Sequence, residues 1–184
     1  DYAYFSSTSS SWCLHAKKYV EDTIKKLSLT GNSLVVEIAS NDGYLLQYIK
    51  EKNIPCFGIE PTHAVAEASR EKGIETIEKF FGSSLAIDLR SNKSIAENGA
   101  DLIIGNNVLA HVPEINDFLK GVYILLKDEG VASFEFPHLL QLLRGNQFDT
   151  IYHEHFSYFS LHSLIRICKK AGLKVFDVEE LETH

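Results

Sequence analysis

The sequence predicts a doubly wound α/β sheet, mostly parallel, with helices on both faces. Short apolar segments of strand type alternate with segments of helical periodicity over most of the 184 residues. This alternation is typical of parallel strands joined by right-handed crossovers. Several of the apolar segments end in polar turns. Because ligands of such sheets bind beyond the carboxyl ends of the strands, these turns are candidate binding sites.

Each expected element has a local reason. Apolar side chains recur with helical spacing over residues 12–29, and Gly31 ends that helix. Residues 33–38 then form a continuous apolar run, as in buried parallel strands. Gly73 ends another helix, and Pro113 stands in the first turn of a later one. The further expected helices are residues 44–52, 62–72, 83–91, 113–126 and 161–171, and the further expected strands are residues 54–60, 74–80, 100–105, 130–136 and 173–178.

Composition excludes several function classes. The chain is 45% hydrophobic, which suits a globular domain with a sizeable core. Its net charge of −7, without a basic stripe, argues against a nucleic-acid partner. No apolar run approaches the roughly 18 residues that span a bilayer, and no signal-peptide pattern is present, so we expect no membrane partner and a cytoplasmic location. Three widely spaced cysteines predict reduced thiols and no metal site in this chain.

The turn after the first strand has the character of a cofactor site. The strand carries Glu37 near its end, and a polar turn leads to a single glycine, Gly43. A dinucleotide fold prefers three glycines there, to admit a pyrophosphate. S-adenosylmethionine (SAM) has no phosphates and tolerates the shortage. The cofactor candidates in this segment are Glu37, Ala39, Ser40, Asn41 and Gly43.

A second acid, Glu60, ends the next strand, with Pro61 directly after it. A carboxylate can accept hydrogen bonds from both ribose hydroxyls, and Glu60 is placed for this role. Glu37 would hold the turn or reach the amino group of the ligand through water. Two alternatives stay open: both acids merely cap strand ends, or the fold binds a nicotinamide cofactor.

Two further pairs lie where other parts of SAM would bind. Phe80 and Phe81 follow the third strand and would form a wall for the adenine ring, although such residues are as often simply core. Asn106 and Asn107 end the fourth strand, where amides or carbonyls can meet the amino-acid end of the cofactor. A plain turn is the alternative for this pair.

The only long interruption, residues 137–158, contains a cluster of reactive side chains. Loops of this length are usually functional or disordered, and the histidines and aromatic residues here disfavour disorder. His153 and His155 flank Glu154, but the helical zinc motif HExxH is not met. A polar structural cluster, a metal site and a general base are the alternatives. A general base is favoured, because histidine titrates near neutral pH.

These residues together resemble the SAM-dependent sugar C-methyltransferases that act on nucleotide-linked 4-ketodeoxy sugars. Some of the matching motifs are shared by class I methyltransferases in general, and others are specific to this family. The matching segments are residues 4–7 with 11–12, 37–43, 58–62, 106–112 and 152–158. The resemblance implies a class I methyltransferase, Rossmann-like sheet over residues 31–184, preceded by an aromatic arm and helix at 1–30.

The resemblance also implies roles. His155 is the base that removes a proton next to the ketone, Glu154 contacts the sugar, and Tyr152 and His111 steady the enolate or the substrate. A tyrosine of the arm joins them, Tyr4 being the best match. The partner is then a small-molecule nucleotide sugar, and the product of the cofactor is S-adenosylhomocysteine.

The chain is expected to be the central part of a longer protein, because it contains no methionine. The family has a zinc-binding domain before this part and a further domain after it, so zinc is expected only outside this chain. The usual final antiparallel strand is also expected to be missing, which would leave a sheet edge open to self-association. An O- or N-methyltransferase of small molecules, or a non-catalytic SAM-binding module, are the other hypotheses.

Overall fold

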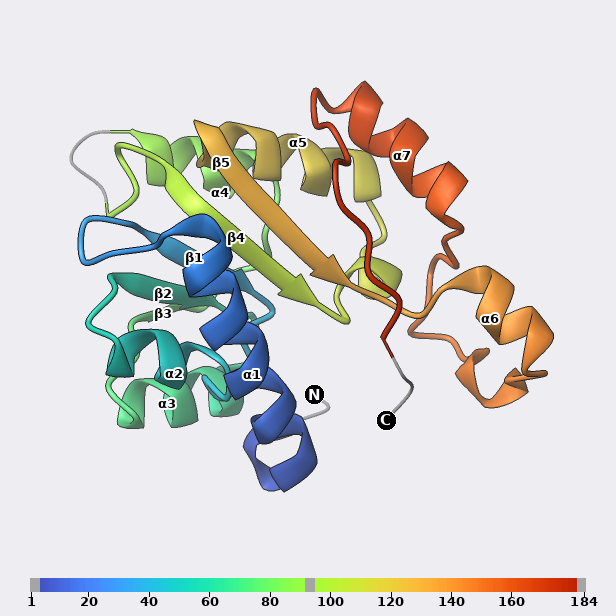
Figure 1. Cartoon of the computed structure of the whole chain (residues 1–184), viewed down its shortest axis with the longest axis horizontal. Helices are drawn as coiled ribbons and strands as arrows, with labels where there is room; N and C mark the ends of the chain where they lie inside the picture. The colour runs from blue at the N-terminus through green and yellow to red at the C-terminus, as the bar shows by residue number, and fades with distance from the viewer. Residues whose placement is uncertain (1–3, 92–94, 182–184) are drawn as a thin grey trace.

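A parallel sheet with the strand order β3-β2-β1-β4-β5 forms the centre of the protein (Figure 1). The computed structural model describes residues 4–91 and 95–181. Its strands are β1 (Val35–Ile38), β2 (Cys56–Ile59), β3 (Thr76–Ile77), β4 (Ala100–Asn106) and β5 (Leu126–Glu135). Its helices are α1 (Ser10–Leu27), α2 (Leu46–Glu51), α3 (His63–Glu71), α4 (Ser83–Arg90), α5 (Ile115–Leu125), α6 (Leu139–Arg144) and α7 (Leu161–Lys170). Short 3-10 turns are η1 (Ser6–Thr8), η2 (Leu109–His111) and η3 (Phe148–Thr150).

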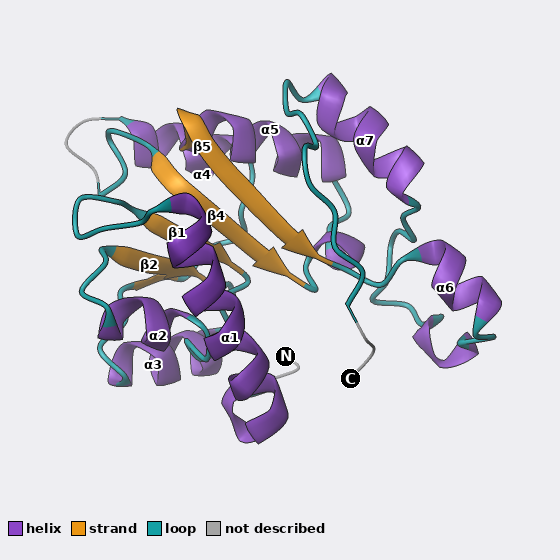
Figure 2. Ribbon diagram, in the orientation of Figure 1, coloured by secondary structure: helices purple, strands orange, loops and turns teal. Residues whose placement is uncertain are grey.

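Helices cover both faces of the sheet, as expected for a doubly wound fold (Figure 2). Alternate residues of one strand point to opposite faces. Thus Leu102 and Ile104 of β4 pack against α1 and α2, whereas Ile103 packs against α4, α5 and α7. All three side chains are fully buried. Strands buried on both faces are continuous apolar runs, which is why the sequence pattern located them.

The strand order places a switch point between β1 and β4. The chain leaves β1, builds outward to β3, and returns across the sheet to β4, which pairs with β1 on its other side. Crossovers to either side of this point diverge, and a ligand can enter the gap that they leave beyond the strand ends. The turn after Ile38 and the pair Asn106 and Asn107 therefore lie at the same carboxyl edge of the sheet.

The expected strand over residues 173–178 is wrong. Leu173 and Val175 pack toward the core while Phe176 and Val178 are exposed, so the segment has the alternation of a strand. Yet no backbone hydrogen bond joins residues 174–181 to β5 in the part of the chain that the structure describes. Alternation reports that one side is buried, and a coil lying along a sheet has that property as well.

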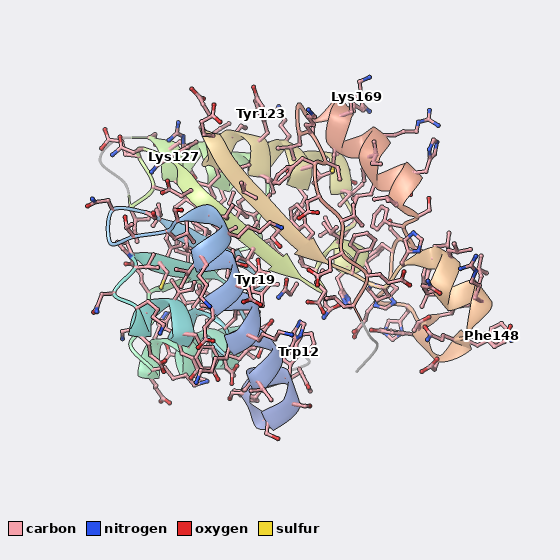
Figure 3. All side chains as sticks on the ribbon, viewed as in Figure 1. Trp12, Tyr19, Tyr123, Lys127, Phe148 and Lys169 are labelled. Carbon is pink, nitrogen blue, oxygen red and sulfur yellow. The ribbon has the colours of Figure 1, made fainter. Side chains whose placement is uncertain are left out.

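The interruption at 137–158 is a closed excursion that contains α6 and η3, neither of which was expected. Its ends meet in a parallel bridge between His138 and Phe159, where the Leu139 N–H donates to the Phe159 carbonyl at 2.9 Å. The His138 Nε2 also accepts from the Leu161 N–H at 3.0 Å. In Figure 3, Phe148 marks the outer tip of this excursion, and its side chain is 73% exposed.

Gly43 is required by the packing of this fold. Its φ is +75°, and a Cβ there would lie 2.5 Å from Ile74 Cδ1 and 2.9 Å from Ser69 Oγ. Left-handed backbone and overpacking together are expected to make Gly43→Ala about 2–4 kcal/mol less stable. Gly31→Ala is the matched control, because its Cβ would lie 3.5 Å from its nearest neighbour, the Asn53 carbonyl oxygen. Urea unfolding of both variants measures the difference, and equal losses would contradict this account.

Candidate functional site

In the turn after β1, every second residue has a left-handed backbone conformation. Ala39, Asn41 and Gly43 have φ values of 56°, 51° and 75°. Such alternation turns successive peptide groups so that backbone donors face a common ligand position. Asparagine and glycine adopt this backbone readily, but alanine at positive φ is strained by about 1–2 kcal/mol. Strain of this kind persists only where the surroundings hold it, and it is concentrated at ligand sites.

Glu60 holds this turn in place from the end of β2. One carboxylate oxygen accepts the Asn41 N–H at 3.2 Å, and the other accepts the Thr62 N–H at 2.9 Å. The side chain is only 6% exposed. A carboxylate offers about four acceptor positions, so each oxygen keeps capacity for a hydroxyl donor. Glu60 therefore joins two loops and can still bind a vicinal diol.

Glu37 lies beneath the turn and is 1% exposed. Burial, followed by the nearby Asp42 and Glu60 carboxylates, raises the pKa of Glu37 well above its ordinary value. Its Oε2 and the Ser40 Oγ have no hydrogen-bond partner within residues 4–91 and 95–181. Buried polar atoms that lack partners mark a position where a ligand or water completes the bonding.

Asn106 faces the same region from β4. Its side-chain amide is buried beside the Tyr44 hydroxyl without reaching hydrogen-bond geometry. Burial also raises the pKa of Tyr19, on α1, to about 12 and that of Tyr44 well above its ordinary value. Both phenols therefore stay protonated and uncharged.

The raised pKa of Glu37 makes stability depend on pH. The folded protein retains this proton above pH 4.5, where the unfolded chain has lost it. The contribution of Glu37 is thus present at low pH and is lost as pH rises through the folded pKa. In Glu37→Gln the loss of unfolding free energy between pH 4.5 and 8 should be smaller than in the natural protein, because the amide has no proton to release.

Urea unfolding across this pH range, with the exposed Glu129→Gln as control, measures the effect. Identical pH profiles for Glu37→Gln and the natural protein would show that Glu37 is ionised in the fold.

The reactive cluster centres on His155, which lies in the excursion between β5 and α7. Its Nδ1 is 2.8 Å from the Thr150 carbonyl oxygen. Because a carbonyl only accepts, Nδ1 must carry the proton, and Nε2 is left as the basic nitrogen. The rings of Tyr152, His111 and Tyr158 lie 4.2, 4.7 and 5.8 Å from the His155 ring, centroid to centroid.

Backbone contacts fix this cluster at the carboxyl end of β4. The Phe156 and Ser157 N–H groups donate to the Ala110 carbonyl at 2.8 and 3.3 Å. Ala110 and His111 belong to η2, which follows directly after Asn107. Burial, and next the charge of His155, lower the pKa of His111, so His111 stays neutral near pH 7.

The other predicted residues of the cluster are more open. Tyr152 is 42% exposed, and His153 and Glu154 are exposed as well. Tyr4 is joined to the cofactor turn: the Asn41 Nδ2 donates to the Tyr4 carbonyl at 2.8 Å. Tyr2, the other tyrosine of the arm, lies outside the described residues.

The two phenylalanines after β3 differ in environment. Phe81 packs edge to face on Phe118, with ring centroids 5.4 Å apart. Phe80 is 85% exposed. Phe81 is therefore a partly buried core residue, whereas Phe80 is open to solvent. Pro61 follows Glu60 and leads into α3.

Sequence reasoning missed an ion pair at the same carboxyl edge. The His15 Nε2 of α1 is 2.9 Å from the Glu135 Oε2 at the end of β5, and Trp12 stacks on His15 and on Tyr44. Glu135 pairs in register with Asn106. Its position at a strand end, shortly before Pro137, was the available signal, the same one that identified Glu60.

Sequence reasoning also missed an apolar cavity of about 230 Å³ beside the reactive cluster. It shares Thr150 and Tyr158 with the surroundings of His155. Its lining is residues Leu139, Leu142, Leu143, Asn146, Gln147, Phe148, Thr150, Ile151 and Tyr158. Because α6 and η3, which build most of it, were not expected, no pattern in the sequence pointed to this cavity.

Comparison with known proteins shows to which family this chain belongs. A family model described as a methyltransferase domain matches residues 14–178. The chain belongs to the methyltransferase domain family. The C-methyltransferase NovU of Streptomyces niveus is 36% identical over 183 residues, which cover 100% of this chain and 43% of NovU. The chain thus spans less than half the length of this curated relative.

Solved structures agree on the fold. A SAM-dependent methyltransferase from Archaeoglobus fulgidus has a TM-score of 0.65 at 16% identity, covering 85% of this chain and 68% of that chain. The plantazolicin methyltransferase BpumL, solved with a substrate analogue and S-adenosylhomocysteine, has a TM-score of 0.60 at 14% identity, covering 84% and 60%. The expected class I methyltransferase fold is confirmed, with SAM as the cofactor of this domain.

The residues of the methyltransferase domain fit SAM. The buried unpartnered oxygens of Glu37 and Ser40, together with the diol-binding capacity of Glu60, suit a ligand that carries a ribose and polar amino-acid groups. Within the described ranges, no helix is long and apolar enough to cross a membrane. No group of three or more His, Cys, Asp or Glu side chains is arranged for a metal ion in the same ranges.

Proposed function

We propose that this domain catalyses SAM-dependent C-methylation next to the ketone of a nucleotide-linked deoxy keto sugar, through an enolate. The observation that carries the proposal is the state of His155. Its Nδ1 is fixed as a donor on the Thr150 carbonyl, so that in the neutral ring Nε2 is the nitrogen that can accept a proton. A proton next to a ketone is only weakly acidic, and a positioned base is needed to remove it. The similarity to NovU, a C-methyltransferase, supports the same reaction type.

The cofactor residues divide by position. We assign the ribose hydroxyls to Glu60, and the amino-acid end to Glu37, Asn106 and Asn107. The backbone of Ala39, Ser40, Asn41 and Gly43 lines the turn, and Pro61, Phe80 and Phe81 border the adenine. SAM, when bound, supplies an electrophilic methyl group. The domain supplies alignment of the acceptor carbon with that group.

The proton and electron movements follow from the cluster. His155 Nε2 removes the proton from the carbon next to the ketone, and the electron pair of that C–H bond moves onto the ketone oxygen. His111 and Tyr152 donate hydrogen bonds to the developing enolate oxygen. Glu154 binds a sugar hydroxyl, and Tyr4 of the arm steadies the substrate. The ketone re-forms as the enolate carbon bonds to the methyl group. The bond between that methyl group and the cofactor sulfur would break at the same time, its electron pair remaining on sulfur in S-adenosylhomocysteine.

The imidazolium of His155 is stabilised until it releases its proton to solvent. Its Nδ1–H remains on the Thr150 carbonyl, 2.8 Å away. The Tyr152 ring, with its centroid 4.2 Å from that of His155, favours the cation through its π face. Burial and the positive charge of His155 both lower the pKa of His111, so His111 stays neutral during the reaction.

His155→Asn tests the base. The Asn Nδ2 can replace His Nδ1 as the donor to Thr150, while the basic Nε2 is removed. In the intact protein, exchange of the α-proton of a nucleotide-linked 4-ketodeoxy sugar in deuterated water should fall at least about 100-fold. Affinity for S-adenosylhomocysteine should be unchanged. The matched control is His153→Asn, an exposed histidine of the same segment, which should exchange normally.

Exchange that persists in His155→Asn would remove His155 from the role of base. If the natural protein exchanges no keto-sugar proton but methylates an oxygen or nitrogen, the alternative O- or N-methyltransferase reaction holds instead.

We also propose where further contacts of the protein lie. The outer edge of β5 has no partner strand among the described residues, so its ladder groups are open to pairing with a second copy. Self-association there would be detected by light scattering and lost on substitution of Ala132 by proline, because the backbone groups of Glu135 and Ser133 face β4 and those of Ala132 face the outer edge. A cytoplasmic location is part of the same proposal.

A further inference from the structure

The N-terminal arm, residues 4–9, is fastened to the cofactor turn by side chains of that turn. The Asn41 Oδ1 accepts the Ser6 N–H at 2.8 Å, and the Asn41 Nδ2 donates to the Tyr4 carbonyl at 2.8 Å. Asp42 accepts the Ser7 N–H at 3.3 Å and also the Ser7 hydroxyl. Thus the two polar side chains in the middle of the turn face the arm.

The contacts of Ser6 and Ser7 with the turn are partly buried, whereas the bond from Asn41 to the Tyr4 carbonyl is exposed. Ser6 is 6% exposed and Asp42 is 1% exposed. The charge of Asp42 is balanced by Lys72 from the end of α3, whose Nζ lies 3.1 Å from the carboxylate and 2.7 Å from the Asp42 carbonyl. Hydrogen bonds of this kind, shielded from water and partly charged, hold a short segment more firmly than exposed ones.

The same residue links the arm to the ribose acceptor. Asn41 is left-handed, with φ of 51°, and its N–H bonds Glu60 while its side chain bonds the arm. If the arm leaves, the Asn41 side chain loses two partners, and the left-handed backbone at Asn41 is held with fewer contacts, chiefly those of Glu60 and Lys72. The arm and the cofactor therefore bind the same conformation of this turn. Docking of the arm favours binding of the cofactor, and binding of the cofactor favours docking of the arm.

We propose that Asn41 is a positioning residue that makes the arm a cofactor-linked cover, so that SAM binding and docking of residues 4–9 stabilise one another. The cover closes the cofactor turn and brings Tyr4 to the carboxyl edge of the sheet only when the turn is formed. The proposal uses the cofactor of the domain and is independent of the identity of the methyl acceptor.

The first test removes one donor from the arm. Ser6 is the first residue of η1, where proline is tolerated, and Phe5 before it is extended, with φ of −100° and ψ of 104°. Ser6→Pro should weaken S-adenosylhomocysteine binding about three- to tenfold in the intact protein, the equivalent of one such hydrogen bond. Calorimetry measures this. Ser10→Pro is the matched control, at the first position of α1 after the extended Ser9, where the N–H has no partner within the described chain.

The second test removes the side chain of the turn without straining it. Asn41→Gly keeps the left-handed backbone and the N–H to Glu60, and should weaken binding by a similar factor. Asn53→Gly, another asparagine with φ of 55° at a distant turn, is its control. Combining Ser6→Pro with Asn41→Gly should weaken binding no further than Asn41→Gly alone, because Asn41→Gly already removes the contact that Ser6→Pro breaks.

Hydrogen exchange provides the reciprocal measurement. S-adenosylhomocysteine should slow exchange at the Ser7 amide in the natural protein, and this slowing should be reduced in Asn41→Gly. If Asn41→Gly weakens binding while Ser6→Pro does not, Asn41 touches the cofactor directly and the proposal is overturned. Unchanged affinity in both variants, or arm exchange that ignores the ligand, overturns it as well.

Discussion

The carboxylate of Glu60 is the contact on which the site depends. It receives one backbone N–H from the turn after β1 and one from the loop after β2, and so fixes the two loops that enclose the cofactor position. Together with the Lys72 bond to the Asp42 carbonyl and the bonds from Asn41 to the arm, it holds the left-handed Asn41 and the strained Ala39. The sheet supplies rigid strand ends, but the shape of the site is set by these contacts.

The same edge of the sheet brings together three acidic side chains whose charges repel one another. Glu37, Asp42 and Glu60 lie close together and are buried, and Lys72 neutralises only Asp42. A proton retained on Glu37 relieves this repulsion. The buried Glu37 Oε2 and Ser40 Oγ still lack a hydrogen-bond partner among the described residues. A ligand with a positive charge and hydrogen-bond donors relieves both. Stability of the domain and affinity for its cofactor are therefore opposed at Glu37, as is common where a binding site is preorganised.

Much of the fold followed from the sequence because its strands are buried on both faces. The continuous apolar runs placed β1, β2 and β4 correctly, and strand-end chemistry placed Glu37, Glu60 and Asn106 at one edge. Sequence patterns gave a wrong prediction where a segment is buried on one side but forms no hydrogen bonds with a neighbouring strand. Residues 173–178 alternate without pairing, and α6 lies in a segment that contained no cap or periodicity long enough to recognise. The His15–Glu135 pair joins residues 120 positions apart, which no local pattern records.

The bridge between His138 and Phe159 has an evolutionary consequence. It ties both ends of the excursion that carries His155 to the rim of the sheet, and the bonds from Phe156 and Ser157 to the Ala110 carbonyl form a second attachment. Closing a longer loop costs only slightly more conformational entropy than closing a shorter one. Residues can thus be inserted or exchanged between the bridge and the Ala110 contact without disturbing the strands. A fold of this design can evolve to bind new methyl acceptors through changes in residues 137–158, while the turn that binds the cofactor stays the same.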